Sequence, residues 1–131
     1  MADLNLGSNQ RLKHQKLIAR LFKEGHSLFS YPFKLLWLPV ESRSGSPFLF
    51  SVSIPKKTFP LAVQRNRLKR QTREAFRLQQ LDIPEYPGRS VALMYIYVGK
   101  EAISYTSIDR SIRYLTKLLK KSIRKSNPPD V

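Results

Sequence analysis

The chain of 131 residues contains no cysteine and only two histidines, His14 and His26. Disulfides, thiol nucleophiles and thiolate zinc sites are therefore excluded, and two histidines do not complete a zinc site alone. No apolar run reaches the length of about 18 residues that a membrane helix needs, and polar residues interrupt the start of the chain, unlike a signal peptide. We therefore expect a cytoplasmic protein.

Acidic residues are also few, because nine Asp and Glu stand against 24 Lys and Arg and leave a formal charge of +15. So basic a surface attracts polyanions, which are nucleic acids or anionic membranes. Hydrophobic residues make up 41% of the chain, so we expect a folded core. The length fits one domain over residues 1–131, with flexible ends at 1–10 and 126–131.

Hydrophobic periodicity predicts helices over residues 14–24 and 63–81 and a last helix near the C-terminus. We expect Gly25 to end the first helix in a left-handed conformation, and Thr106 or Ser107 to cap the last, with Asp109 in its first turn. The predicted buried stripe of the last helix is Ile108, Ile112, Leu115, Leu119 and Ile123.

Strands are predicted over residues 33–40, 48–54 and 90–98, the last nearly all apolar and therefore central in the sheet. The polar segment 41–47 is typical of a hairpin loop, so we expect the first two strands to form an antiparallel pair. An irregular connector follows over residues 56–62, because prolines bracket it. This order indicates an α+β sandwich with helices on a small mixed sheet.

The densest charge lies in residues 63–77, where six basic side chains accompany one acid, Glu74. Arginine can grip a phosphate with two hydrogen bonds and stack on a base, which favours nucleic acid over lipid. The alternatives are a solvated helix face and a membrane-surface helix. Glu74 is expected to pair with arginines. On a helix, Asn66, Arg70, Arg73 and Arg77 share one face, flanked by Arg65 and Lys69, with Leu68, Thr72, Ala75 and Phe76 opposite.

This segment resembles the signature helix of the bacterial ribonuclease P protein component, and the resemblance covers about Arg11 to Arg124. It implies a two-layer α+β sandwich, a ferredoxin-like variant of the ribosomal protein S5 domain 2-like type. Its βαβ crossover would be left-handed and its order α-β-β-(β)-α-β-α, with the bracketed strand optional. The matching residues are Arg65-Asn66-Arg67, Lys69-Arg70, Arg73-Glu74 and Arg77, with Arg11-Leu12-Lys13, Phe22, Gly25, Phe48 to Val52, Lys56-Lys57 and Ala62-Val63.

The resemblance implies two sets of site residues. Those expected to bind the RNA subunit are Arg65, Asn66, Arg67, Lys69, Arg70, Arg73 and Arg77. Those expected to bind the 5′ leader of precursor tRNA, in a cleft between the first helix and the sheet, are Lys13, Ile18, Phe22, Leu36, Lys56 and Lys57.

Ile18 and Leu36 are aliphatic where many relatives carry aromatic residues. Either leader affinity is therefore lower, or an aromatic group at Trp37, Phe33 or Tyr31 substitutes. Other interpretations also stay open: Phe22 and Trp37 could be core residues, Lys56 and Lys57 a solvated loop, and the basic residues of the last helix a diffuse positive field.

No paired carboxylates or nucleophile–base set occurs at a suitable spacing, so we do not expect the chain to perform chemistry. The resemblance implies an accessory subunit of an endoribonuclease, with Mg²⁺ held mainly by the RNA and the protein present as a monomer. The rival interpretations are a structural or ribosomal RNA-binding protein, a helix-turn-helix DNA-binding regulator with residues 63–79 as recognition helix, and an autonomous nuclease.

Overall fold

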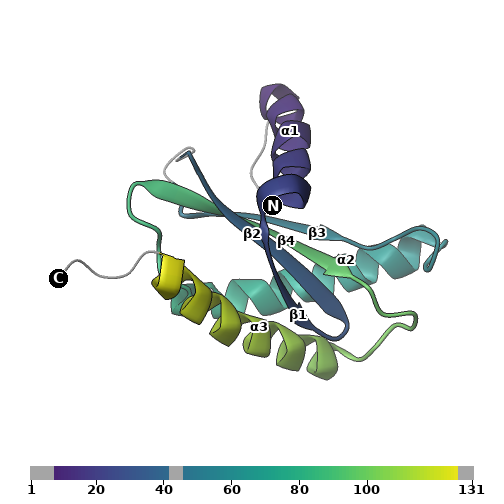
Figure 1. Cartoon of the computed structure of the whole chain (residues 1–131). Helices are drawn as coiled ribbons and strands as arrows, with labels where there is room; N and C mark the ends of the chain where they lie inside the picture. Colours follow the sequence, from purple (N-terminus) through teal and green to yellow (C-terminus); the bar gives the residue numbers. More distant parts are fainter. Residues whose placement is uncertain (1–7, 42–45, 127–131) are drawn as a thin grey trace.

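The computed structural model describes residues 8–41 and 46–126, with side chains described from residue 15 onward. α1 begins at Ser8, ahead of the expected start, and α3 ends at Ser126; the rest of the expected flexible ends lies outside the described residues. Hydrophobic alternation did not predict β1, which is the additional strand that the family resemblance allowed. The elements are α1 (Ser8–Glu24), β1 (His26–Ser30), β2 (Phe33–Glu41), β3 (Phe48–Ser53), α2 (Ala62–Gln79), a 3-10 turn (Gln80–Asp82), β4 (Arg89–Tyr97) and α3 (Tyr105–Ser126) (Figure 1).

The four strands form one mixed sheet in the order β1-β2-β4-β3. β4 pairs antiparallel with β2 and parallel with β3, so the predicted β2–β3 hairpin is wrong. The physical reason is the burial of β4, because Leu93 and Tyr95 are covered on one face and Ala92 and Met94 on the other. A strand that is apolar on both faces is best shielded from water inside the sheet, where it has a neighbouring strand along each edge. The predicted central position of β4 is therefore confirmed.

The parallel unit β3–α2–β4 crosses over with the left hand, against the strong general preference for right-handed crossovers (Figure 1). α2 and α3 lie side by side under one face of the sheet, and α1 lies on the other face. The fold is therefore the expected α+β sandwich, with α1 added over part of the second face.

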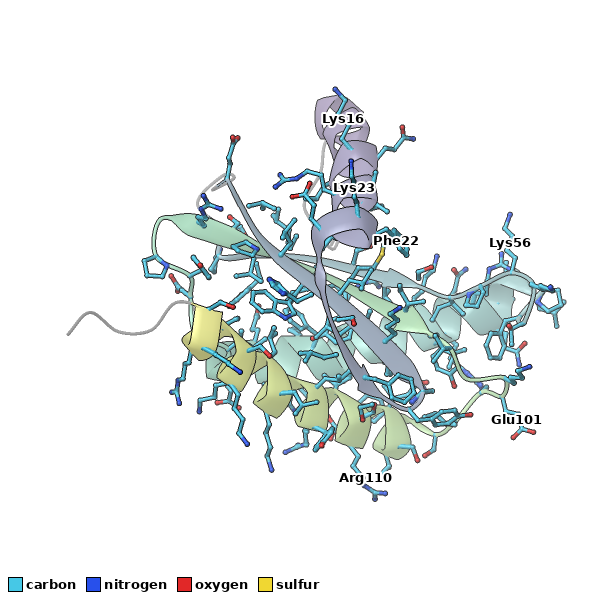
Figure 2. All side chains as sticks on the ribbon, in the orientation of Figure 1. Lys16, Phe22, Lys23, Lys56, Glu101 and Arg110 are labelled. Carbon is cyan, nitrogen blue, oxygen red and sulfur yellow. The ribbon has the colours of Figure 1, made fainter. Side chains whose placement is uncertain are left out.

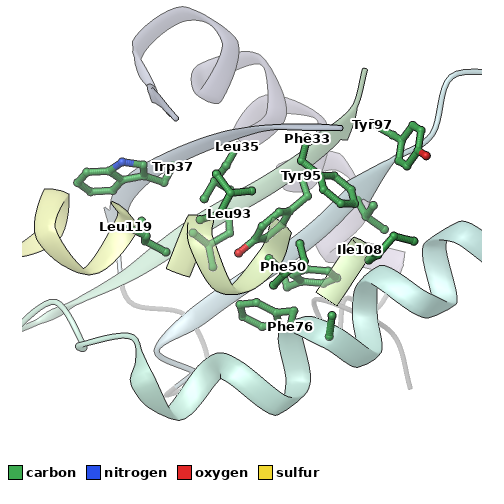
Figure 3. Close-up of a cluster of buried hydrophobic side chains, with 14 of the residues drawn as sticks. Phe33, Leu35, Trp37, Phe50, Phe76, Leu93, Tyr95, Tyr97, Ile108 and Leu119 are labelled. Atoms are coloured by element: carbon green, nitrogen blue, oxygen red, sulfur yellow. The ribbon is translucent and has the colours of Figure 1, made fainter. Parts of the chain in front are cut away.

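The main core fills the space between the sheet and the α2–α3 layer (Figure 3). Its aromatic centre includes Phe50 and Phe76, whose rings stack with centroids 4.5 Å apart. All five residues of the predicted stripe of α3 are at most 2% exposed, which confirms that prediction. Burying a large apolar side chain contributes about 1.5–3 kcal/mol, so this layer dominates the stability of the fold.

Both predicted helix caps are wrong in detail. Gly25 does not adopt the left-handed conformation; its N–H donates a 2.9 Å hydrogen bond to the Leu21 carbonyl, and a Cβ would lie 2.4 Å from that oxygen. Glycine is therefore required at this position for close approach. At the start of α3 the cap is Ser104, whose hydroxyl accepts the Ser107 N–H at 3.2 Å, and Asp109 lies beyond the first turn.

Candidate nucleic-acid interface

The sequence places the basic side chains of α2 on the surface because the other side of the helix is buried. Leu68, Thr72, Ala75 and Phe76 are at most 6% exposed, as predicted. The opposite side forms the arginine face, which we define as the seven residues expected to bind the RNA subunit. Asn66, Arg67, Arg70 and Arg77 in this set are exposed, and Arg65, Lys69 and Arg73 are half-buried.

Arg65 has a structural contact that charge patterning did not predict. One of its terminal nitrogens donates hydrogen bonds to the carbonyl oxygens of Phe59 at 2.8 Å and Pro60 at 2.9 Å. These bonds tie the first turn of α2 to the connector that follows β3. Arg65 therefore positions the connector, whatever contact its remaining N–H groups make with a partner.

Glu74 lies within the arginine face and pairs with Arg77. The Arg77 guanidinium donates two hydrogen bonds to the two carboxylate oxygens, at 3.0 Å and 2.7 Å. The hydrogen bond from Arg77 lowers the pKa of Glu74, and the same bond raises the pKa of Arg77. The expected role of Glu74 as an ion-pair partner is confirmed, and the pair fixes the plane of the guanidinium.

The second candidate surface lies on the other face of the sheet, beside α1. Leu17 and Leu21 of α1 cover Leu36, Leu38 and Met94. Beyond Leu36 and Met94, towards the start of β2 and the end of β4, α1 no longer covers the sheet. One row of cross-strand neighbours lies there, on the same side as α1: Phe29, Lys34, Ile96 and Ser53.

We give the name α1 cleft, after the cleft that the family resemblance implies, to the surface that has this uncovered row as its floor and Phe22, Lys56 and Lys57 as its rims. Phe22, on the last turns of α1, forms one rim and is 64% exposed, so its interpretation as a core residue is wrong. Lys56 and Lys57 are exposed beyond the end of β3, and Figure 2 shows Lys56 on the same side of the sheet as α1. Lys34 adds a further cation on the floor.

The remaining residues expected in the leader site have different environments. Ile18 is half-buried against the cluster under α1, and Leu36 is only 5% exposed, so Leu36 supports the helix more than it offers a surface. Lys13 belongs to α1, but its side chain lies outside the described residues.

Of the three aromatic substitutes considered, Trp37 and Phe33 are ruled out, because both are at most 1% exposed in the core on the α2–α3 side of the sheet. Trp37 is thus a core residue. Tyr31 is 60% exposed at the turn between β1 and β2. Phe29 was not among the residues predicted for this site, but it is 58% exposed and faces the α1 cleft. In the sequence, the adjacent apolar residues Leu28 and Phe29 indicate a strand, but they do not show which of the two side chains faces the core.

Two features are absent from the described residues. These residues contain no helix that is both long and apolar enough to cross a bilayer. Nor do they contain a group of three or more His, Cys, Asp or Glu side chains that could hold a metal ion. The exposed cations of α3 include Arg113, which pairs with Asp109 at 2.8 Å.

Comparisons with known proteins agree with this geometry. The family model of ribonuclease P matches residues 6–123. The ribonuclease P protein component of Porphyromonas gingivalis is 29% identical over 116 residues, which cover 86% of this chain and 84% of the relative. That of Chlorobium phaeobacteroides is 36% identical over 108 residues, which cover 72% of this chain and 73% of the relative.

Solved structures show the same fold. The RNase P protein of Staphylococcus aureus superimposes with a TM-score of 0.64 at 21% identity, covering 92% of this chain and 97% of that one. The RNase P protein of Thermotoga maritima gives a TM-score of 0.62 at 27% identity, covering 85% and 94%. Because the family model spans most of the sequence and the fold agrees, this chain belongs to the ribonuclease P protein family.

Proposed function

We propose that this chain binds the catalytic RNA of ribonuclease P through the arginine face and the 5′ leader of precursor tRNA in the α1 cleft. In this role it assists RNA-catalysed removal of the leader, which leaves the mature 5′ end of the tRNA. One observation carries the proposal: among the described residues, two separate cationic surfaces lie on opposite sides of one sheet, and the α1 cleft combines its cations with the widely exposed rings of Phe22 and Phe29.

The arginine face suits a folded RNA. Arg67 and Arg70 project into solvent from one side of a rigid helix, where they can contact phosphates. Neutralising phosphates releases condensed counterions, which gives strong binding at low salt without reading a base sequence. Folded RNA is recognised largely by its shape and backbone, so a fixed array of arginines on one helix is an appropriate contact surface.

The α1 cleft suits a single strand. Unpaired bases can stack on exposed aromatic rings, and Phe22 and Phe29 offer such rings on the rim and on the floor. Lys34, Lys56 and Lys57 place positive charge around them for the backbone phosphates. Stacking tolerates any base, which fits leaders of varied sequence.

We further propose that the RNA holds the Mg²⁺ ions and performs the cleavage, while the protein supplies positive charge and position. The lack of a metal-binding group of acidic and histidine side chains among the described residues supports this division. The protein would act in the cytoplasm as a monomer, with each surface engaging one RNA.

The proposal is tested by multiple-turnover cleavage of precursor tRNA at low Mg²⁺, using a bacterial ribonuclease P RNA with and without the purified protein. We expect strong stimulation that requires the RNA, with the cut at the mature 5′ end. Tight RNA binding without stimulation would contradict the proposal and indicate a structural RNA-binding protein, and cleavage without added RNA would indicate an autonomous nuclease.

A further inference from the structure

A pocket of about 540 Å³ lies beside the arginine face, between the start of β3 and the second half of α2. Its apolar side is formed by Phe48, Phe50 and Phe76, and its charged side by Arg70, Arg73 and the Arg77–Glu74 pair. The three aromatic rings belong to the α2–α3 side of the sheet, so the pocket is separate from the α1 cleft. Its volume is within the range of about 300–1,000 Å³ typical of sites for small molecules.

We propose that this pocket holds one unstacked nucleotide of the partner RNA, with its base against Phe48 and its phosphate beside Arg70 and Arg77. The inference rests on the proposed function, because it assumes that the arginine face binds RNA. It adds a defined subsite for a single base to a face that would otherwise contact only the backbone.

The aromatic side of the pocket combines two buried, stacked rings with a third ring that is partly exposed. Phe50 and Phe76 are at most 6% exposed and stack at an interplanar angle of 20°. Phe48 stands edge-on to Phe76, with centroids 6.5 Å apart, and is only half-buried. One ring is thus held in place by a fixed aromatic base and still offers surface to the pocket, as a stacking partner for a nucleobase requires.

The charged side selects an anion. Glu74 is the acid in the lining, and its two oxygens already accept hydrogen bonds from Arg77. Arg70 is exposed on the turn before, so the lining keeps a net positive charge next to the rings. A ligand that joins a flat apolar group to a negative charge matches both sides, and a nucleotide is such a ligand.

The position of the pocket favours a nucleotide of RNA over a free one. Arg70, Arg73 and Arg77 belong both to the pocket and to the arginine face, so a strand that follows the face passes its mouth. A base in a loop or bulge is already unstacked and can enter without opening a helix.

The first test compares the affinity of a bacterial ribonuclease P RNA for the wild type, Phe48→Leu and Phe48→Tyr. Removing the stacking ring should weaken binding roughly 5- to 150-fold in Phe48→Leu, with little change in the salt dependence. Phe48→Tyr keeps the ring and should bind like the wild type. Tyr114→Leu, which removes an exposed ring from α3, is the matched control and should also bind like the wild type.

If Phe48→Leu binds the RNA as tightly as the wild type, the inference is wrong. Failure of the wild type itself to bind would instead overturn the proposed function. Urea unfolding midpoints of the variants distinguish the removal of a stacking ring from a disturbed fold.

A second measurement does not depend on substitutions. In two-dimensional NMR of the wild type, adenosine monophosphate should give saturable shifts at the backbone amides of Phe48, Phe50 and Phe76, and ribose 5-phosphate should not. Equal responses to the two would reduce the pocket to a general anion site and overturn the inference, as would no response to the nucleotide at tens of millimolar.

Discussion

A terminal nitrogen of Arg65 donates a 2.8 Å hydrogen bond to the carbonyl oxygen of Phe59. Phe59 is itself 3% exposed and packs edge-on against Tyr97, with ring centroids 5.4 Å apart. The start of α2 is thereby anchored to the core through the connector that carries Lys56 and Lys57. One arginine of the arginine face thus helps to position the lysines at the rim of the α1 cleft, and it links the two proposed RNA-binding surfaces.

Replacing Arg65 should therefore affect stability as well as RNA binding. Arg65→Ala removes charge-assisted hydrogen bonds to two carbonyl groups, and we expect it to lower the free energy of unfolding by about 1–2 kcal/mol. Arg67→Ala is the matched control, because Arg67 is exposed on the same turn, and its stability should change by less than about 0.5 kcal/mol. Urea unfolding of the two variants measures the difference, and equal stabilities would rule out the anchoring role.

The α1 cleft makes a prediction about substrate discrimination. Phe22→Ala and Phe29→Ala should each weaken binding of precursor tRNA by the holoenzyme, by about 1–3 kcal/mol for each base that can no longer stack. Mature tRNA lacks the leader, so its affinity should not change. The affinities of both RNAs are measured for each variant in complex with the RNA subunit.

Tyr114→Ala provides the control for this experiment. Tyr114 is 53% exposed, but on α3, on the other side of the sheet from the α1 cleft. Its removal should leave both affinities unchanged. An equal loss for precursor and mature tRNA in the Phe29 variant would show that Phe29 does not contact the leader.

The helices could be predicted from sequence because their signal is local. The stripe of α3 and the buried side of α2 follow from apolar residues spaced three and four apart, and that spacing needs no knowledge of the rest of the chain. The arginine face could be predicted for the same reason. The burial of Leu68 was sufficient to indicate that Arg70 points outward.

The sheet could not be predicted in the same way. β2 and β3 are neighbours in sequence, but β4 separates them, and its place depends on residues that come much later in the chain. The face that Phe29 occupies is fixed by its pairing with Lys34, and the Leu28-Phe29 pair fits either face until that register is known. Likewise, the charge of Arg65 indicates a partner for the guanidinium, but not that the partner is a carbonyl of the connector.

The arginine face predicts how RNA-subunit binding depends on salt. Arg70→Ala and Arg73→Ala should each weaken assembly with the RNA subunit. For each phosphate that the variant no longer neutralises, the slope of log affinity against log salt should also become shallower by roughly 0.7–0.9. Binding titrations at several salt concentrations measure this slope. A loss of affinity with an unchanged slope would mean that the side chain does not bind a phosphate.

The Arg77–Glu74 pair predicts a pH dependence. Because Arg77 depresses the pKa of Glu74, the pair is complete above the ordinary pKa of glutamate and is lost as the pH falls through the lower pKa of the folded state. We expect the Glu74 carboxyl, followed by NMR, to titrate below its ordinary range in the wild type and to return to that range in Arg77→Gln. Identical titration curves would show that the two side chains do not pair in solution.

Gly25 connects the geometry of α1 to leader binding. A Cβ at this position would lie 2.4 Å from the Leu21 carbonyl oxygen, so Gly25→Ala must displace the end of α1, which carries Phe22. We expect a loss of about 1–3 kcal/mol in stability, as for other overpacked sites, together with weaker preference for precursor over mature tRNA.

Gly88→Ala separates these two effects. Gly88 has a φ of 71° and open space around it, so alanine there costs about 1–2 kcal/mol through backbone strain alone. Both variants should unfold at lower urea concentration, but only Gly25→Ala should lose discrimination between the two tRNAs. If both variants discriminate like the wild type, the end of α1 does not set the position of Phe22 for the leader.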